Sequence, residues 1–277
     1  MSSPDLSAKT EHLQSLISSL GRATVAYSGG VDSTLLLAVC QRVLGTDRVL
    51  ALTVASAMTP RVERERTSEL AAQLGARHRV VPFDALSDRD VVANRPDRCY
   101  HCKRAMFERL LVIAEAEGLG ALLHGANVDD QDDRRPGMRA AVELGARAPL
   151  LDAGFTKEDV RVLSREMGLP TRDLPSMACL ASRIPYGISL TVEALERVDA
   201  AESHLRREFA LRQVRVRDHF PLARIEVPET DMGRLLRPGV RVKAVGYLEA
   251  LGYQYVTLDL RGFRSGSMNE TLADKPR

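Results

Sequence analysis

The sequence predicts an α/β fold, in which a parallel sheet carries helices on both faces, followed by a small C-terminal α+β domain. Over the first 170 residues or so, short β-branched and apolar runs alternate with segments that place apolar residues at helical spacing. A glycine-rich turn joins the first run to the first helical segment. Later in the chain, a long charged helical segment precedes three short strand-like runs. At about 150 residues per domain, 277 residues leave room for both parts.

The first domain is expected to start with a strand, a tight turn and a helix. Ala23 to Tyr27 is apolar and β-branched, Ser28-Gly29-Gly30 supplies the turn, and Asp32 to Leu44 has helical spacing. A helix over 156–167 opens with a capping-box pattern at Thr156. The same signals predict strands over 49–54, 79–83 and 121–125, helices over 60–74 and 103–117, and a loop over 94–102. In such a sheet the ligand site lies at the carboxyl ends of the strands.

A breaker-rich stretch separates the two domains. Prolines 170, 175 and 185 and Gly187 fall between residues 170 and 189. We therefore expect a domain over 1–170, a hinge loop over 171–189 that carries Cys179, and a substrate-binding and oligomerisation domain over 190–277. The last domain is expected to contain helices over 192–209 and 239–251 and strands over 214–217, 223–227 and 254–260.

Charge and hydropathy exclude several classes of protein. The 39 Lys and Arg residues nearly balance the 37 Asp and Glu residues, so no global field favours nucleic acid or anionic lipid. No apolar run approaches the roughly 20 residues needed to cross a bilayer. The first residues lack the pattern of a secretory signal, so we expect a cytoplasmic protein without membrane or nucleic-acid partners.

The turn after the first strand is typical of anion binding. In Ser28-Gly29-Gly30-Val31-Asp32-Ser33, the glycines permit a tight turn, and backbone N–H groups and hydroxyls at a helix start suit a pyrophosphate. The run is neither a Walker nor a dinucleotide motif, and a turn that only starts a helix is the alternative. The run resembles the PP-loop of the ATP pyrophosphatases, which include GMP synthetase, NAD synthetase and tRNA thiolases. That resemblance implies cleavage of ATP to AMP and pyrophosphate, with nucleotide-binding residues Ser28, Gly29, Gly30, Asp32 and Ser33 and with Asp32 as a candidate Mg²⁺ ligand.

Three cysteines form a second candidate site. Cys99 and Cys102 have a spacing that is compatible with zinc, an iron–sulfur cluster or a redox dithiol. Adding Cys179 makes three thiolates, which suit a four-iron cluster with one iron left open, whereas structural zinc would need a further ligand such as His101 or His124. The fourth cysteine, Cys40, falls on the apolar face of a predicted helix and is expected to be a core thiol.

Cys179 is also the best candidate nucleophile or sulfur ligand. Arg183, four residues later, would favour its thiolate. Several runs resemble the LarE family of sulfur transferases, which act in the synthesis of the nickel-pincer nucleotide cofactor. They span nearly the whole chain and comprise 94–103, His124-Gly125-Ala126-Asn127, Arg135-Pro136-Gly137, 179–187 and 262–269.

The resemblance implies a reaction in which ATP adenylates the carboxylates of pyridinium-3,5-biscarboxylic acid mononucleotide and sulfur then displaces AMP to leave thiocarboxylates. Members with only the cysteine that matches Cys179 sacrifice its sulfur, whereas members that also carry a Cys-x-x-Cys pair hold a [4Fe-4S] cluster and deliver sulfide bound to it. This chain has the pair, which implies ATP, Mg²⁺ and the cluster as cofactors, a sulfide donor and a homo-hexamer.

Further polar residues are candidates for the mononucleotide site. Arg215 and Arg217 fall on one side of a predicted strand, and their guanidinium groups could bind a phosphate. Glu226 could act as acid or base, with a cross-strand ion pair as the alternative. Asp129, Asp130, Asp132 and Asp133 could hold Mg²⁺ or form a surface loop. Rival functions are a PP-loop tRNA thiolase and a non-catalytic metal- or nucleotide-binding sensor.

Overall fold

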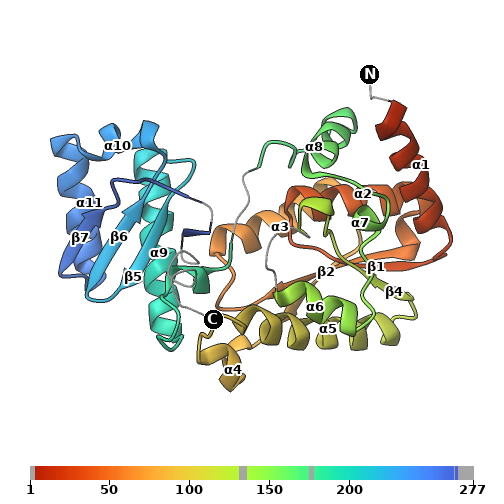
Figure 1. The fold of residues 1–277 in the computed structure, drawn as a ribbon, viewed down its shortest axis with the longest axis horizontal. Helices are drawn as coiled ribbons and strands as arrows, with labels where there is room; N and C mark the ends of the chain where they lie inside the picture. The colour runs from red at the N-terminus through yellow and green to blue at the C-terminus, as the bar shows by residue number, and fades with distance from the viewer. Residues whose placement is uncertain (1–3, 131–135, 175–177, 265, 268–277) are drawn as a thin grey trace, which may run out of the picture. The chain divides into compact units, whose positions relative to one another are not determined.

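The computed structural model describes residues 4–130, 136–174, 178–264, 266 and 267. It divides into two compact units (Figure 1). The first unit comprises Met1–Ser56, Arg61–Ala85 and Asp97–Met177, and the second comprises Ala57–Pro60, Leu86–Pro96 and Ala178–Arg277. The second unit thus includes two short segments from the first hundred residues. Asp132, Asp133, Arg135, Pro175, Ser265, Met268 and Asn269 lie outside the described residues.

The first unit is built on the predicted parallel sheet. Its four strands are β1 (Ala23–Ala26), β2 (Val49–Ala55), β3 (His78–Pro82) and β4 (Ala121–Leu123), in the order β3-β2-β1-β4. Every pairing between them is parallel, and β1 lies between β2 and β4. The glycine turn therefore follows the carboxyl end of a strand in the interior of the sheet.

Helices cover both faces of this sheet, as Figure 1 shows. On one face, a core cluster unites apolar residues of β1 with those of α1 (Pro4–Ser18), α2 (Val31–Leu44), α7 (Pro149–Asp152) and α8 (Lys157–Glu166). On the other face, α5 (Arg98–Ala116) and α6 (Pro136–Glu143) pack on β2 and β4 through a second cluster. The predicted helix over 60–74 is α3 (Arg61–Gln73). This two-faced burial confirms the predicted fold class.

The predicted boundary between the loop over 94–102 and the helix over 103–117 was wrong. The loop expected over 94–102 ends earlier, because α5 begins at Arg98 and carries both Cys99 and Cys102. Helical periodicity is hard to see in this first turn, where aliphatic residues are lacking. The turn is instead anchored by Arg98, which is 3% exposed, and the buried Phe107 and Leu110 continue the same helix.

The second unit contains a mixed three-stranded sheet. Strands β5 (Arg215–His219), β6 (Leu222–Glu226) and β7 (Tyr255–Leu258) lie in that order, with β5 antiparallel and β7 parallel to β6. Helix α9 (Val192–Phe209) has the predicted bounds, and α10 (Glu229–Leu235) and α11 (Pro238–Ala250) complete the core. The unit also holds α4 (Arg89–Val92) and a short 3₁₀ helix, Leu180–Arg183, directly after Cys179. Among the described residues, no helix is both long and apolar enough to cross a membrane.

Candidate functional site

The turn after β1 has a backbone that only glycine accommodates at one position. Gly29 has a φ of 69°, in the left-handed region. A Cβ on Gly29 would lie 2.7 Å from Oγ1 of Thr67, on α3. The Thr67 hydroxyl lies within hydrogen-bonding distance of the Ser28 carbonyl, at 3.3 Å, and ties the turn to that helix. The turn is therefore held in a single close-packed conformation.

Hydroxyl and amide groups gather within this turn. Oγ of Ser28 lies 3.1 Å from Oγ of Ser33, and it accepts a hydrogen bond of 3.4 Å from the Gly30 amide. The Ser33 hydroxyl in turn accepts from the Ser28 amide at 3.3 Å. Helix α2 starts here without a side-chain cap on Gly30, so its positive end faces the turn. This is the chemistry that binds a phosphate.

Asp32, in the first turn of α2, joins three parts of the first unit. Its Oδ1 accepts a 3.0 Å hydrogen bond from Nδ2 of Asn127, which follows β4. Its Oδ2 forms an ion pair with the Nζ of Lys157, the first residue of α8. Gly125 makes this convergence possible, because a Cβ there would lie 2.9 Å from the Ser33 nitrogen. Sequence reasoning missed Lys157, whose only signal was its place directly after the Thr156 cap.

Two carboxylates of the acidic run after β4, those of Asp129 and Asp130, accept hydrogen bonds from backbone amides near Asp32. Oδ2 of Asp130 accepts from the Asn127 amide at 3.0 Å, and Oδ2 of Asp129 accepts from the Lys157 amide at 2.6 Å. Both carboxylates therefore shape the loop that carries Asn127 and the start of α8.

His124, just before this loop, is buried. Its burial lowers its pKa to about 4, which keeps the imidazole neutral at pH 7.

The paired cysteines belong to the first unit. Cys99 and Cys102 are three residues apart at the start of α5, a spacing that puts both on one helix face. Both are partly buried, and Nη2 of Arg98 lies 3.8 Å from the Cys99 sulfur. Within the described ranges, no group of three or more His, Cys, Asp or Glu side chains could hold a metal ion. Cys40 is a core thiol as expected, since it is fully buried and burial raises its pKa to about 12.

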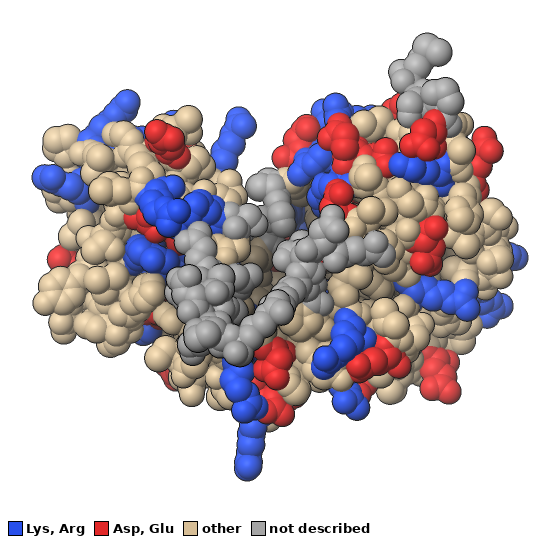
Figure 2. Space-filling model, in the orientation of Figure 1, with Lys and Arg blue, Asp and Glu red and all other residues tan. Residues whose placement is uncertain are grey.

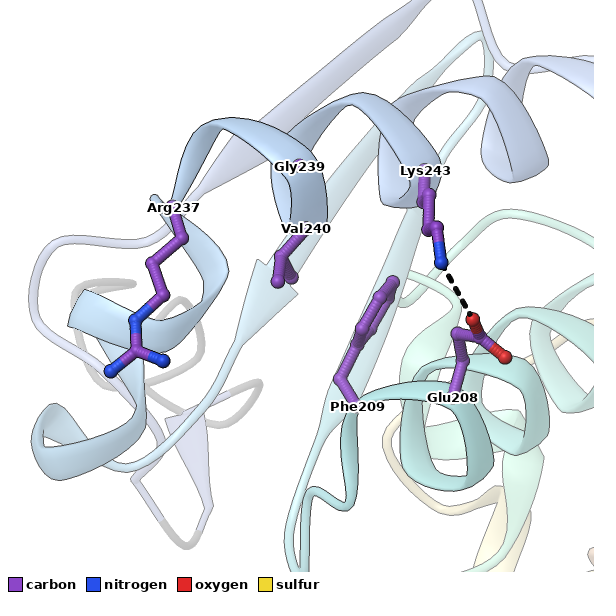
Figure 3. Close-up of a pocket in the computed structure, with 6 residues that line it drawn as sticks. All are labelled: Glu208, Phe209, Arg237, Gly239, Val240 and Lys243. Atoms are coloured by element: carbon purple, nitrogen blue, oxygen red, sulfur yellow. Dashed lines mark hydrogen bonds and ion pairs between the residues drawn. The ribbon is translucent and has the colours of Figure 1, made fainter.

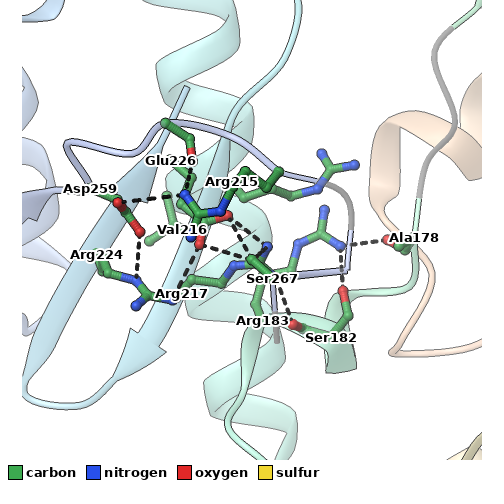
Figure 4. A network of polar contacts seen from close by, with 12 residues as sticks. Ala178, Ser182, Arg183, Arg215, Val216, Arg217, Arg224, Glu226, Asp259 and Ser267 are labelled. Carbon is green, nitrogen blue, oxygen red and sulfur yellow. Dashed lines mark hydrogen bonds and ion pairs between the residues drawn. The ribbon is translucent and has the colours of Figure 1, made fainter. Parts of the chain in front are cut away.

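Cys179 belongs to the second unit, where Arg183 holds the backbone of the Cys179 loop. Figure 4 shows the contact of Arg183 with the neighbouring Ala178. Nη1 of Arg183 donates to the carbonyls of Ala178, at 2.6 Å, and Cys179, at 3.1 Å. The same guanidinium binds both carboxylate oxygens of Glu202, at 2.7 and 2.9 Å, and both side chains are fully buried. The sequence interpretation used the Arg183 charge to favour the Cys179 thiolate. In the structure Glu202 offsets that charge, and Arg183 contacts the carbonyl of Cys179.

Glu202, on α9, is the centre of this arrangement and was missed by sequence reasoning. Burial disfavours its charged form, but Arg183, Arg206 and Arg215 outweigh burial and hold the pKa of Glu202 below its ordinary value. Arg206 donates to it at 2.6 Å, and the Val216 amide at 3.1 Å. A buried carboxylate with several donors marks a rigid junction between α9, β5 and the Cys179 loop.

Arg215 and Arg217 are both buried beside this junction. Burial, reinforced by the nearby Arg183 charge, lowers the pKa of Arg215 to about 10, and its guanidinium lies 5.4 Å from the Phe263 ring centroid. Arg217 donates to the Ser182 carbonyl at 2.8 Å and to Glu226 at 2.7 Å. The predicted alternative for Glu226, a cross-strand ion pair, is therefore present.

Together these side chains form what we call the arginine cluster: Arg183, Arg206, Arg215, Arg217 and Arg224 with the carboxylates of Glu202, Glu226 and Asp259. Figure 4 shows that most of them converge between β5, β6 and the 3₁₀ helix. Five cations against three anions leave an excess of positive charge in a largely buried place. Such a cluster has the chemistry of an anion site.

A pocket of about 350 Å³ lies in the second unit between the end of α9 and α11 (Figure 3). Its lining contains none of the predicted site residues and consists of Glu208, Phe209, Arg237, Gly239, Val240 and Lys243. On the face drawn in Figure 2, basic and acidic side chains intermingle over the first unit, in keeping with the balanced composition.

The chain is similar to several known proteins. Residues 6–92 match the NAD synthase family. The chain is 42% identical to the pyridinium-3,5-bisthiocarboxylic acid mononucleotide synthase of Lactiplantibacillus plantarum, over 96% of each chain. It is 40% identical to an uncharacterized protein of Synechocystis, over 96% of this chain and 99% of that one. An argininosuccinate synthase of Halobacterium salinarum is 32% identical over 54% of this chain and 40% of its own length.

Proposed function

Because this chain belongs to the family of the pyridinium-3,5-bisthiocarboxylic acid mononucleotide synthase, we propose that it is an ATP-dependent sulfurtransferase that makes thiocarboxylates on that mononucleotide. The observation that carries the proposal is the meeting of the glycine turn, Asp32 and Asn127 at the carboxyl end of β1. This is where an open parallel sheet binds its ligand.

The residues at the turn fit a magnesium-bound triphosphate. The uncapped start of α2 and the hydroxyls of Ser28 and Ser33 suit the β- and γ-phosphates, and Gly29 and Gly30 let the backbone approach them. The Asp32 carboxylate supplies hard oxygen ligands for Mg²⁺. When bound, the metal would offset phosphate charge and orient the pyrophosphate as a leaving group.

Activation by ATP answers a chemical problem. A carboxylate resists attack at carbon because oxide is a poor leaving group. In the proposed first step a substrate carboxylate oxygen bonds to the α-phosphorus of ATP, and the bond to the β-phosphate oxygen breaks with both electrons leaving on pyrophosphate. In the second step sulfur attacks the acyl carbon and AMP departs, which leaves a thiocarboxylate. Donors at the turn stabilise the negative charge that grows on pyrophosphate.

We assign the mononucleotide to the arginine cluster. Its excess of positive charge suits the phosphate of the substrate, and Arg215 and Arg217 are the proposed phosphate ligands. Glu226, which is fully buried and contacts two arginines, is the proposed acid or base. Arg183 contributes by fixing the carbonyl of Cys179, so we propose a positioning role for it.

The cysteines are the proposed route for sulfur. We propose that Cys99, Cys102 and Cys179 hold a [4Fe-4S] cluster, for which three thiolates are a fitting donor set. Such a cluster would supply one iron without a protein ligand, where external sulfide could bind. The homo-hexamer and the cytoplasmic location expected from the sequence stay predictions.

The test of the proposed function is pyrophosphate release that depends on the mononucleotide. We expect Asp32→Ala and Ser33→Ala to abolish it, because each removes a polar contact to phosphate or Mg²⁺. Ser19→Ala is the control, since that exposed hydroxyl only caps a carbonyl of α1. Wild-type rates in both site variants would overturn the ATP site. Release driven by tRNA instead would favour the thiolase alternative, and ATP binding without release would favour the sensor.

A further inference from the structure

We propose that Thr53 and His78 are positioning residues of the ATP site, which act on the peptide group that leads into the phosphate-binding turn. This role rests on the proposed function, because it takes the turn after β1 as the site of the ATP phosphates. The hydroxyl of Thr53, on β2, donates to the Tyr27 carbonyl at 2.7 Å, and Nε2 of His78, on β3, lies 2.8 Å from the same hydroxyl. A polar relay thus runs from β3 to the residue directly before the turn.

The register of the sheet brings these side chains together. Tyr27, directly after β1, lies beside Thr53, because the last pair of the β1–β2 ladder is one position earlier on both strands. On the other side of β2, His78 pairs with Ala51, two positions before Thr53. Side chains two positions apart leave the same face of a sheet. All three side chains therefore project from one face, where the rings of Tyr27 and His78 meet edge to face with their centroids 6.0 Å apart.

The donors and acceptors of this relay follow from its chemistry. A carbonyl can only accept, so the single hydroxyl proton of Thr53 must point to the Tyr27 oxygen. The Thr53 oxygen then accepts from His78, whose Nε2 must carry a proton. Burial lowers the pKa of His78 below its ordinary value, so the imidazole is neutral at pH 7 and Nε2 holds its one proton. His78 thereby fixes the direction in which the Thr53 hydroxyl donates.

The peptide group before the turn is held on both sides. Its carbonyl oxygen, on Tyr27, accepts from Thr53. Its N–H, on Ser28, donates to Oγ of Ser33 at 3.3 Å. Because each hydrogen bond polarises the next, the Thr53 contact strengthens the N–H that binds Ser33. The Ser33 hydroxyl is thereby oriented to donate its own proton, which it gives to the Gly30 carbonyl at 3.2 Å and would give to a phosphate oxygen of bound ATP.

Binding of Mg²⁺-pyrophosphate and of AMP, each measured by calorimetry, tests this role. Thr53→Val keeps the shape of the side chain and removes the donor to a carbonyl that is shielded from water, since Tyr27 is 2% exposed. We expect pyrophosphate binding to weaken about 3- to 10-fold. AMP binding should not change, because AMP lacks the phosphates that the turn holds. Thr53→Ser keeps the hydroxyl and should bind pyrophosphate like the wild type.

Two substitutions of His78 test the far end of the relay. His78→Phe keeps a ring against Tyr27 but loses the N–H, and it should weaken pyrophosphate binding by a smaller factor than Thr53→Val. His78→Gln keeps an N–H donor and should restore the affinity. This pair decides the matter even if Thr53→Val does not fold.

The matched control is Thr24→Val. Thr24 is fully buried on β1, three residues before Tyr27, and its hydroxyl has no hydrogen-bond partner among the residues that the structure describes. The control thus makes the same chemical change in the same sheet without touching the relay. It should bind both ligands like the wild type.

Wild-type pyrophosphate binding in Thr53→Val, an equal loss of AMP binding, or the same loss in Thr24→Val would each overturn the proposal. Equal affinities in His78→Phe and His78→Gln would remove His78 from it. If the wild type binds no pyrophosphate, the proposal fails together with the ATP site. A selective loss in Thr53→Val, combined with failure of the wild type to thiolate the mononucleotide, would support the relay and count against the proposed substrate alone.

Discussion

Arg183 and Glu202 form a two-pronged ion pair in which neither side chain is exposed, and the same guanidinium binds the carbonyl of Cys179. The pair links α9 to the loop that carries the candidate sulfur residue. When one partner of a buried ion pair is removed, the other charge stays buried without a counter-charge. The stability of the fold therefore depends on both side chains.

We predict that Glu202→Gln lowers the free energy of unfolding of the second unit by about 3–5 kcal/mol. The amide cannot balance Arg183, which stays buried. Because Glu202 has a lowered pKa, its contribution to stability is complete above the ordinary glutamate range and is lost as pH falls through the lower, folded-state value. Denaturant titrations at neutral and acidic pH would measure both effects.

The control for that experiment is Glu208→Gln, also on α9, which removes an exposed ion pair with Lys243. It should change the unfolding free energy by less than about 1 kcal/mol. Equal effects of the two substitutions would contradict the assigned role of Glu202.

Gly125→Ala should damage the ATP site through sterics alone. The new Cβ would approach the Ser33 nitrogen to 2.9 Å and the Asp32 carbonyl carbon to 3.0 Å, and backbone atoms cannot move aside cheaply. We expect a loss of about 1–3 kcal/mol in stability and weaker ATP binding. Gly246→Ala, on α11, meets nothing within 4 Å and should be neutral or stabilising. Calorimetry on both variants distinguishes a local clash from a general glycine effect.

Arg215→Ala or Arg217→Ala should weaken binding of the mononucleotide by about 1.5–3 kcal/mol, because a charge-assisted contact to phosphate is lost. Arg212→Ala, which removes an exposed arginine just before β5, should leave the affinity unchanged. Isothermal titration with the intact substrate decides the matter. Unchanged affinity in all three variants would move the phosphate site away from the arginine cluster.

Much of this architecture was predictable from local pattern. Strands β1, β2 and β4 of the first sheet are short, mostly apolar runs, and α9 has the predicted bounds because a charged periodic stretch ends at Phe209. The capping box at Thr156 could be predicted because its reciprocal contacts join residues within four positions of one another. Local signals of this kind do not depend on the rest of the fold.

Contacts between distant segments were not predictable. Lys157 and Asp32 are 125 residues apart, and Glu202 meets Arg183 only because α9 packs on the 3₁₀ helix. The early start of α5 was missed because Arg98, a buried arginine, does not contribute to an apolar pattern. In each case a tertiary contact determines the role of a charged residue, and a single sequence carries no record of that contact.

The cysteine assignment predicts the metal content. Under strict anaerobiosis the protein should contain iron and acid-labile sulfide, and Cys99→Ala, Cys102→Ala and Cys179→Ala should each lose most of both. Cys40→Ala should keep the iron, since that thiol is buried in the core of the first unit. Zinc without iron in the wild-type protein would contradict the cluster and leave a structural site.

The most direct test is the reaction itself, run anaerobically with pyridinium-3,5-biscarboxylic acid mononucleotide, ATP, Mg²⁺ and sulfide and followed by mass spectrometry of the mononucleotide and of the intact protein. We predict that sulfur replaces a carboxylate oxygen, that each replacement is matched by one AMP and one pyrophosphate, and that Cys179 remains intact over several turnovers. If AMP and pyrophosphate form while the mononucleotide gains no sulfur, or if sulfur is transferred without cleavage of ATP to AMP, the proposed sulfurtransferase reaction is wrong.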